Sequence, residues 1–210
     1  MTWSLNEIDA TAKKAARGAG YDWGLAEETG KAVRWLCSYG FNGCTALATL
    51  LRATDGAAYH DIAPQIGPDN WHARGPALCP IATGAALSDH AATLINTNIR
   101  IQSVHAPLLI LPFVNLAARQ TKTPLTATWA NCSFSTDGTS VSLQGAPTHD
   151  PNDMTMTRGA APTKQQSTTT RTTPDPTVWS ILNTFANRTY APATEASRLL
   201  GAGAGLSDND

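Results

Sequence analysis

The fold class is decided by the stretch Leu125-Thr126-Ala127-Thr128-Trp129, in which apolar and polar residues alternate. Such alternation is typical of a strand that buries one face. The stretch Thr139-Ser140-Val141-Ser142-Leu143 also alternates, and Phe134 lies on the other side of Thr136-Asp137-Gly138. An Asp-Gly pair between apolar runs is a hairpin signal. This part of the chain therefore predicts antiparallel strands.

Further strands are expected on both sides of this hairpin. Alternation over Ile99 to Val104 and over Met154 to Thr157 predicts one strand each. The segment 168–172 is rich in threonine, which favours a strand, although a flexible Thr/Gln-rich linker over 159–173 is the alternative. The apolar run 108–116 fits either a buried strand or a short helix.

Helices are expected before and after the strands. Ser4 and Glu7 form a capping-box pattern at the start of a helix over 7–17, and Asp175-Pro176 opens an apolar helix near the other end. Helical spacing and glycine breaks predict further helices at residues 25–39, 44–52, 81–95 and 193–200. Residues 59–80 have weak periodicity and are expected to form a long ordered loop.

The expected fold class is α+β, because helices and strands are segregated along the chain. The order is an N-terminal helical subdomain, a long ordered loop, a mainly antiparallel sheet and C-terminal helices, all in a single domain over 1–210. The ranges are 1–56 for the helical subdomain, 57–98 for the loop and a helix, 99–173 for the strands, and 174–210 for the last helices and the tail.

Charge and hydropathy exclude several classes of partner. Lys and Arg number 15 against 16 Asp and Glu, so the chain lacks the basic surplus that a phosphate backbone demands. The longest apolar stretch, Ala106 to Val114, is broken by prolines and is far short of the ~20 residues that cross a membrane. The first residues do not resemble a secretory signal. We therefore expect a cytoplasmic protein without nucleic-acid or membrane partners, and the near-zero net charge permits a homo-oligomer.

Familiar catalytic and metal motifs are missing from the sequence. The cysteines Cys37, Cys44, Cys79 and Cys132 match no zinc spacing and are expected to be reduced. No phosphate-binding loop, nucleophile elbow or H-E-x-x-H motif occurs. The run Gly201 to Gly205 superficially matches a dinucleotide fingerprint, but a helix and not a strand is expected before it. The sequence names no cofactor.

Polar residues suited to chemistry are concentrated between Tyr59 and His90. A carboxylate beside an imidazole can orient it as a general base, and the pairs His60-Asp61 and Asp89-His90 are such neighbours. Cys79, placed before a proline, is the best thiol candidate. The catalytic candidates are His60, Asp61, His72, Cys79, Asp89 and His90. Their spacing supports no metal site.

Candidates for substrate binding lie in the same stretch and near the C-terminus. Trp71 is suited to wall an apolar pocket, and Arg74 to bind a carboxylate or phosphate, so a small anionic metabolite is the expected ligand. Glu195 and Arg198 lie three residues apart on one side of the last expected helix. They form either a surface ion pair or part of a tail that closes over the pocket.

Both ends of the chain carry a resemblance to known proteins. The opening, Trp3-Ser4-Leu5-Asn6-Glu7 to Gly24-Leu25-Ala26-Glu27-Glu28, resembles a family of small uncharacterised bacterial proteins of about this length. The ending, Pro192-Ala193-Thr194-Glu195-Ala196-Ser197-Arg198 and Gly201-Ala202-Gly203-Ala204-Gly205, resembles the same family. This resemblance covers most of the chain and implies no activity and no functional residue.

A fainter similarity covers residues 4–52 alone. Two helices joined by a Gly-Ala-Gly turn are similar to the start of the malate and ureidoglycolate dehydrogenase family. That family has a Ser-His-Gly motif after the second helix, where this chain has Ser38-Tyr39-Gly40. We therefore interpret the similarity as a local helix-turn-helix pattern.

The sequence leaves two functions open. The first is a small-molecule metabolic enzyme, or an accessory subunit of one, with a His/Asp/Arg pocket built by the 59–90 segment. The second is a non-catalytic binding or assembly protein that works through subunit contacts. Polar groups of the 59–90 segment gathered in one concavity would favour the first, and scattered histidines beside a large apolar patch would favour the second.

Overall fold

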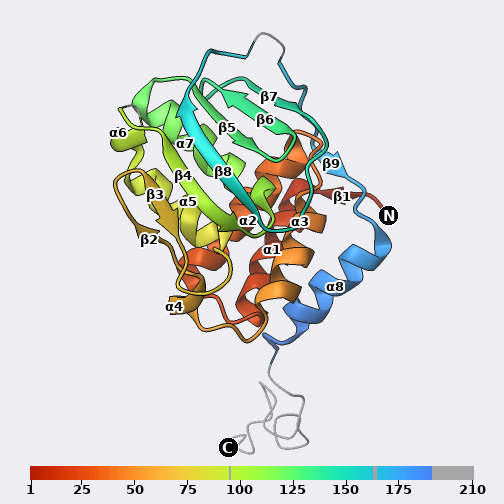
Figure 1. The fold of residues 1–210 in the computed structure, drawn as a ribbon. Coiled ribbons are helices and arrows are strands. Elements are labelled where there is room, and N and C mark those ends of the chain that lie inside the picture. The colour runs from red at the N-terminus through yellow and green to blue at the C-terminus, as the bar shows by residue number, and fades with distance from the viewer. Residues whose placement is uncertain (95, 163–164, 191–210) are drawn as a thin grey trace, which may run out of the picture.

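The computed structural model describes residues 1–94, 96–162 and 165–190 of the chain. A sheet forms one layer, and helices cover one of its faces (Figure 1). The expected α+β class is confirmed, and the sheet is mainly antiparallel as expected. The helix expected over 193–200, with Glu195 and Arg198, lies outside the described residues.

The helical layer begins with α1 (Leu5–Gly18), α2 (Trp23–Ser38) and α3 (Gly43–Thr54), and α8 (Pro176–Asn187) packs against α1 and α3. The predicted capping box is present, because Glu7 N donates to Ser4 Oγ at 3.3 Å and Ser4 N donates to Glu7 Oε2 at 2.8 Å. Asp175 accepts from the first amides of α8. The predictions for these four helices are confirmed.

The main sheet has the strand order β2-β3-β4-β8-β5-β6-β7. All neighbouring pairs are antiparallel except β3 and β4, which are parallel. The strands are β2 (Gln65–Ile66), β3 (Asn70–His72), β4 (Ile99–Val104), β5 (Leu125–Trp129), β6 (Cys132–Thr136), β7 (Val141–Gln144) and β8 (Asn152–Arg158). A separate small sheet pairs β1 (Trp3–Ser4) with β9 (Arg171–Thr172).

The two faces of the sheet differ as the alternation predicts. Along β8, Met154 and Met156 are buried, whereas Thr155 between them is exposed. Thr155 lies opposite Thr128 of β5, which is also exposed. Helix α7 (Leu111–Thr121) packs against β5 and β6. The apolar core therefore lies between the sheet and the helices, and the other face carries threonine.

Three sequence predictions need correction. The segment 59–80 is not loop throughout, because it forms α4 (Tyr59–Ile62), β2 and β3. The single helix expected over 81–95 is two helices, α5 (Pro80–Asp89) and the short α6 (Ala91–Leu94), and His90 between them is the C-cap of α5. Of the strand expected over 168–172, Arg171–Thr172 alone is strand. The ambiguous run 108–116 is helical, with the 3₁₀ turn η1 (Pro107–Ile110) leading into α7.

Helices α5 and α7 approach closely at one glycine. An added Cβ at Gly84 would lie 2.5 Å from Phe113 Cγ and 2.7 Å from Phe113 Cε2. Because these distances are far below van der Waals contact, only glycine fits without a shift of the ring. This packing fixes α5, whose first turn borders the candidate site. None of the helices in the described residues is both long and apolar enough to cross a membrane.

Candidate functional site

A cavity of about 330 Å³ lies where the α1–α2 turn, the end of α3, α4 and the start of α5 meet. We call it the Tyr21–Cys79 cavity. Its volume falls in the range of small-molecule sites. Its lining residues are Ala19, Gly20, Tyr21, Asp22, Leu25, Thr54, Ala57, Tyr59, Ile62 and Cys79.

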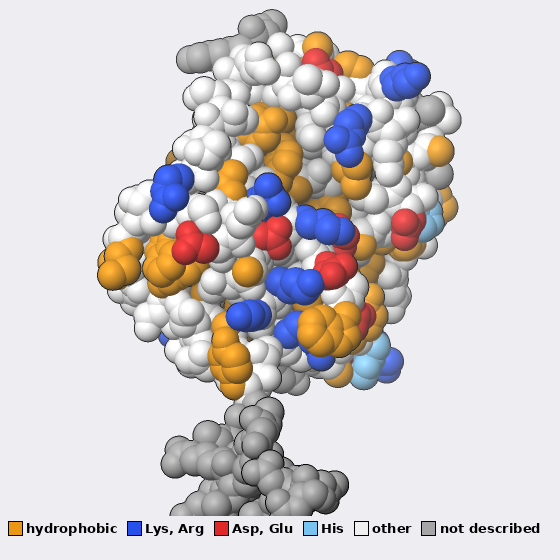
Figure 2. Space-filling view, turned by 180° about the vertical axis from the view of Figure 1, so that it is seen from behind, with side chains coloured by type: hydrophobic (Ala, Val, Ile, Leu, Met, Phe, Trp, Pro, Cys, Tyr) orange, Lys and Arg blue, Asp and Glu red, His pale blue; other side chains and the backbone are white. Residues whose placement is uncertain are grey.

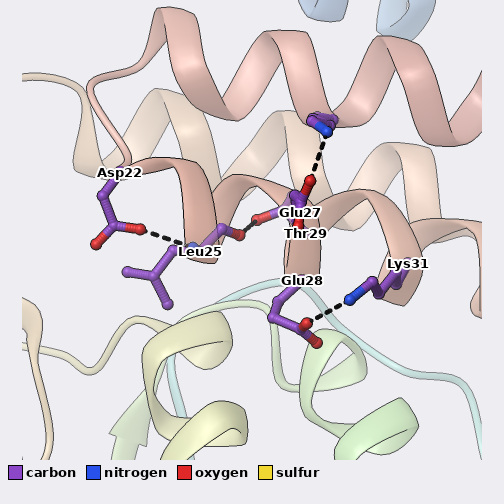
Figure 3. Close-up of polar contacts among 7 residues, drawn as sticks. Asp22, Leu25, Glu27, Glu28, Thr29 and Lys31 are labelled. Atoms are coloured by element: carbon purple, nitrogen blue, oxygen red, sulfur yellow. Dashed lines mark hydrogen bonds and ion pairs between the residues drawn. The ribbon is translucent and has the colours of Figure 1, made fainter.

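The α1–α2 turn places two polar side chains at this cavity. Gly20 adopts φ +96°, which favours glycine and reverses the chain between the helices. Tyr21 follows and is 8% exposed. Asp22 begins α2 as its N-cap, and its Oδ1 accepts a hydrogen bond of 2.7 Å from Leu25 N (Figure 3). The capping geometry therefore fixes the carboxylate at the mouth of the cavity.

The thiol of Cys79 lies at the start of α5. Its backbone N–H donates to Ile62 O at 2.8 Å, which joins α5 to α4. The Cys79 side chain is buried, and its Sγ is 3.4 Å from Tyr21 Oη. Burial raises the pKa of the Cys79 thiol, and the nearby amides of Ala82 and Ile81 oppose this only in part. The thiol is therefore protonated near neutral pH and is a weak nucleophile there.

The phenol groups at the cavity are neutral as well. Burial is the largest cause that raises the pKa of Tyr21, and the neighbouring Cys79 raises it further. Burial also raises the pKa of Tyr59, followed by the charges of Cys79 and Asp22. Thr54 Oγ1 donates to Leu50 O at 2.9 Å within α3. The cavity thus offers neutral hydroxyl and thiol groups, with the Asp22 carboxylate as the one charged side chain among its lining residues.

The histidines expected to act in catalysis lie elsewhere. His60 Nε2 is 3.3 Å from Asp61 Oδ1, but both side chains are largely exposed beside the cavity wall. His72 is exposed on β3. His90 Nδ1 is 2.9 Å from Ala86 O, and its ring packs edge-on against Trp71 at 5.8 Å. These histidines therefore form no common site.

The remaining predicted residues are also dispersed. Trp71 is buried, with its Nε1 donating to Gly67 O at 3.0 Å, so it is a core residue. Arg74 is exposed. Asp89 is exposed at the end of α5, about 15 Å along the helix from Cys79 by the usual rise per residue. Within the described residues, no three His, Cys, Asp or Glu side chains are grouped as metal ligands.

A second depression, of about 500 Å³, lies on the helical face of the molecule. We call it the basic groove. Figure 2 shows Lys and Arg interspersed with Asp and Glu on this face. Lys13 donates to Glu27 at 2.8 Å (Figure 3), and Arg188 forms a double hydrogen bond with Asp55. The groove is lined by Ala10, Lys13, Lys14, Arg17, Trp23, Arg188 and Thr189.

Aromatic side chains border the basic groove. Trp23 is 66% exposed, and the Arg17 guanidinium stacks 4.4 Å from its ring centroid. The ammonium of Lys14 lies 5.7 Å from the ring centroid of Tyr190, which is also exposed. Attraction between the guanidinium and the ring quadrupole stabilises this stacked arrangement. The arrangement provides both a flat apolar surface and positive charge.

Sequence reasoning missed most residues of both sites. Tyr21, Asp22 and Thr54 are single polar residues in a helical region, and no motif marks them. Of the residues that the sequence singled out, Cys79 lines the Tyr21–Cys79 cavity, and Pro80 at the first helical position places it at a helix start. The basic groove had a weak signal, the spacing of Lys13, Lys14 and Arg17 on one side of a helix.

Comparison with known proteins adds little about function. No curated protein matches the chain. Among solved structures, malate dehydrogenase from Entamoeba histolytica matches 73% of this chain with a TM-score of 0.45 and 11% identity. This chain spans 48% of the length of that one. The expected resemblance to an uncharacterised family is confirmed for the start of the chain, because residues 3–76 match a family model described as a protein of unknown function (DUF3726).

Proposed function

We propose that this chain binds a small molecule in the Tyr21–Cys79 cavity. The observation that carries the proposal is the contact between the buried Tyr21 hydroxyl and the buried Cys79 thiol, 3.4 Å apart at the wall of a cavity of ligand size. Buried polar groups normally form hydrogen bonds within the core or within secondary structure. Polar groups that instead face a cavity are the usual means of orienting a ligand.

The lining chemistry favours a neutral or cationic ligand. No Lys, Arg or His side chain lines the cavity, whereas the Asp22 carboxylate does. The rings of Tyr21 and Tyr59 can pack against a cation or an apolar group. The neutral thiol and phenols suit hydrogen bonding better than nucleophilic attack. We therefore infer that the cavity binds a ligand. His60, His72 and His90 do not line it, so they are not proposed as acid–base groups for a ligand bound there.

Three probes of similar size and different charge test the proposal: benzylamine, benzyl alcohol and benzoate. A cavity smaller than this one can hold a benzene ring. Saturation-transfer NMR on the whole chain gives the relative binding of the three compounds, and the amide shifts of the protein locate each one. We expect benzylamine and benzyl alcohol to shift the amides of residues 19–25 and 79–82, and benzoate to leave them unchanged.

A matched pair of variants makes this experiment specific. Ala57 lines the cavity and Ala58 does not, although both are exposed. Ala57→Phe should fill the cavity and abolish both sets of shifts, and Ala58→Phe should leave them intact. Unchanged binding to Ala57→Phe would place the ligand elsewhere and refute the proposal.

The charge of Asp22 can be removed without loss of the helix cap. Asparagine caps helices as well as aspartate does, so Asp22→Asn should fold with near-normal stability. An exposed carboxylate contributes roughly 0.2–1 kcal/mol to an ion pair. Benzylamine should therefore bind up to about fivefold more weakly to Asp22→Asn, while benzyl alcohol binds equally. Equal weakening of both compounds would show that the Asp22 carboxylate does not recognise the positive charge of benzylamine.

The basic groove supports a second candidate function, the binding of a small anionic metabolite. The observation in its favour is the exposed Trp23 ring stacked by Arg17, beside Lys14. Lys13 and Arg188 are partly neutralised by Glu27 and Asp55, so Lys14 and Arg17 supply most of the available charge. In the same NMR experiment, benzoate should shift the amides of residues 10–17, and Arg17→Gln should remove that shift.

An assembly role makes a different prediction from both. A protein that works through subunit contacts should bind none of the three probes, and its mass measured by light scattering should increase with protein concentration. A constant monomer mass together with probe binding at either site would exclude that role.

A further inference from the structure

Two cysteines meet at the α2–α3 junction, away from both candidate ligand sites. Cys37 lies in the last turn of α2 and Cys44 in the first turn of α3. Their Sγ atoms are 3.8 Å apart, and both side chains are buried. A disulfide requires about 2.05 Å between sulfurs, so the two Sγ atoms must approach each other further for a bond to form. Cys79 and Cys132 have no such contact among the thiols of the described residues.

The start of α3 is arranged around the Cys37 sulfur. The N-cap residue Asn42 makes no side-chain hydrogen bond to the helix amides. Those amides are ordinarily satisfied by a capping oxygen. The Gly43 N–H donates to Phe41 O at 2.8 Å, and the start of α3 lies close to the Cys37 sulfur, since a Cβ added at Gly43 would be 3.4 Å from Cys37 Sγ. The hydrogen bond from the Cys44 thiol is the largest cause that lowers the pKa of Cys37, and the helix amides contribute in the same direction.

Glycine makes this close approach possible. An added Cβ at Gly43 would lie 2.9 Å from Leu36 Cβ and 3.4 Å from Cys37 Sγ. A side chain at this position would therefore push α3 away from α2. The positive end of α3 is thus held directly at a thiol, which is the environment that stabilises a thiolate.

A cavity borders both cysteines. It has a volume of about 230 Å³ and is lined by Cys37, Cys44, Asn42 and Thr45 together with the chain over 172–175. A water molecule occupies about 30 Å³, so hydrogen peroxide, which is only slightly larger, fits easily. The cavity therefore has room for a small oxidant beside the two cysteines.

We propose that Cys37 and Cys44 form a peroxide-reactive pair, in which Cys37 attacks the oxidant and Cys44 closes the disulfide. The Cys37 thiolate attacks one peroxide oxygen, the O–O bond breaks, and hydroxide leaves and takes up a proton to form water. Cys37 is then a sulfenic acid. The Cys44 sulfur attacks Cys37 Sγ, the S–S bond forms, the S–O bond breaks, and a second water leaves with the proton of Cys44. Two thiols are oxidised and one peroxide is reduced to two waters.

The sequence provides a convenient readout. Trypsin cleaves after Arg34 and Arg52, so both cysteines fall in one peptide over 35–52, while Cys79 and Cys132 fall in separate peptides. The full-length reduced protein is treated with hydrogen peroxide, free thiols are blocked with iodoacetamide, and the peptides are analysed by mass spectrometry. We expect peptide 35–52 to lose two hydrogens and both alkylation sites, and to recover them after reduction by dithiothreitol.

Rates and variants distinguish this pair from ordinary thiols. Peptide 35–52 should be oxidised at least about tenfold faster than the peptides of Cys79 and Cys132, and this difference should disappear in urea. In Cys44→Ser, dimedone should trap a sulfenic acid at Cys37, and in Cys37→Ser no adduct should form at Cys44.

Two results would overturn the proposal, and both are measured on the wild-type protein. One is equal or faster oxidation of Cys79 or Cys132 in the folded wild-type protein. The other is a peptide 35–52 that keeps both free thiols until the protein unfolds, which would show that the pair is merely buried.

Discussion

The contact between Tyr21 and Cys79 can be measured by a double-mutant cycle in the free energy of unfolding. Tyr21→Phe removes the hydroxyl that lies 3.4 Å from Cys79 Sγ, and such a buried hydrogen bond contributes about 1 kcal/mol. Cys79→Ala removes a buried sulfur, and the lost packing together with the unpaired Tyr21 hydroxyl should cost roughly 1–2 kcal/mol. Because each single change breaks the same contact, the double variant should be less destabilised than the sum by about 0.5–1 kcal/mol.

The assay is urea unfolding followed by far-ultraviolet circular dichroism, with the four proteins compared at one pH. Thr54 lies near the Tyr21 hydroxyl and is present in all four, so its contribution cancels in the coupling energy. Additivity within about 0.3 kcal/mol would refute the reasoning. It would mean that the hydroxyl and the thiol do not depend on one another, and that the cavity wall is not a preformed polar pair.

Two further outcomes follow from the packing and from the pKa shifts. Gly84→Ala should lower the free energy of unfolding by roughly 1–3 kcal/mol, because the new methyl group overlaps the Phe113 ring. Gly24→Ala, where an added Cβ makes only ordinary contact at 3.5 Å, should be neutral or stabilising by up to about 1 kcal/mol, and chemical denaturation compares the two. Stability should also fall at alkaline pH, because burial raises the folded-state pKa of both Cys79 and Tyr21. Their contribution is complete below about pH 8.5, the unfolded pKa of cysteine, and decreases as pH rises, so unfolding curves at pH 7 and 10 should differ less in the Cys79→Ala, Tyr21→Phe protein.

Local signals predicted most elements of the fold. The Ser4–Glu7 pattern located the start of α1, and the alternation of Leu125 to Trp129 coincides with β5. Both depend on residues only a few positions apart. The two short strands β2 and β3 were missed, since two or three residues cannot show a period. Their pairing is also non-local, because Asn70 of β3 lies beside Arg100 of β4.

The candidate site was harder to predict than the fold. Histidines and acids are dense between residues 59 and 90, which favours them as site residues, but density along an irregular segment does not determine where each side chain points. His72 points to solvent, and Trp71 beside it is buried in the core. The cavity instead joins Tyr21 to Cys79, which are separated by 58 positions. No local pattern encodes that pairing.

The sulfur and carboxylate groups of the candidate sites all lie at the ends of helices. Asp22 is the N-cap of α2, Cys79 is the N-cap of α5, and Cys37 lies close to Gly43 at the start of α3. Helix starts carry unpaired N–H groups and a partial positive charge, so a polar atom placed there is held in position by the backbone itself. Cys37 and Cys79 are also buried within the apolar core, whereas Asp22 is exposed. Conservative changes such as Asp22→Asn and Cys44→Ser should therefore alter ligand or peroxide chemistry while the packing between helices and sheet stays intact.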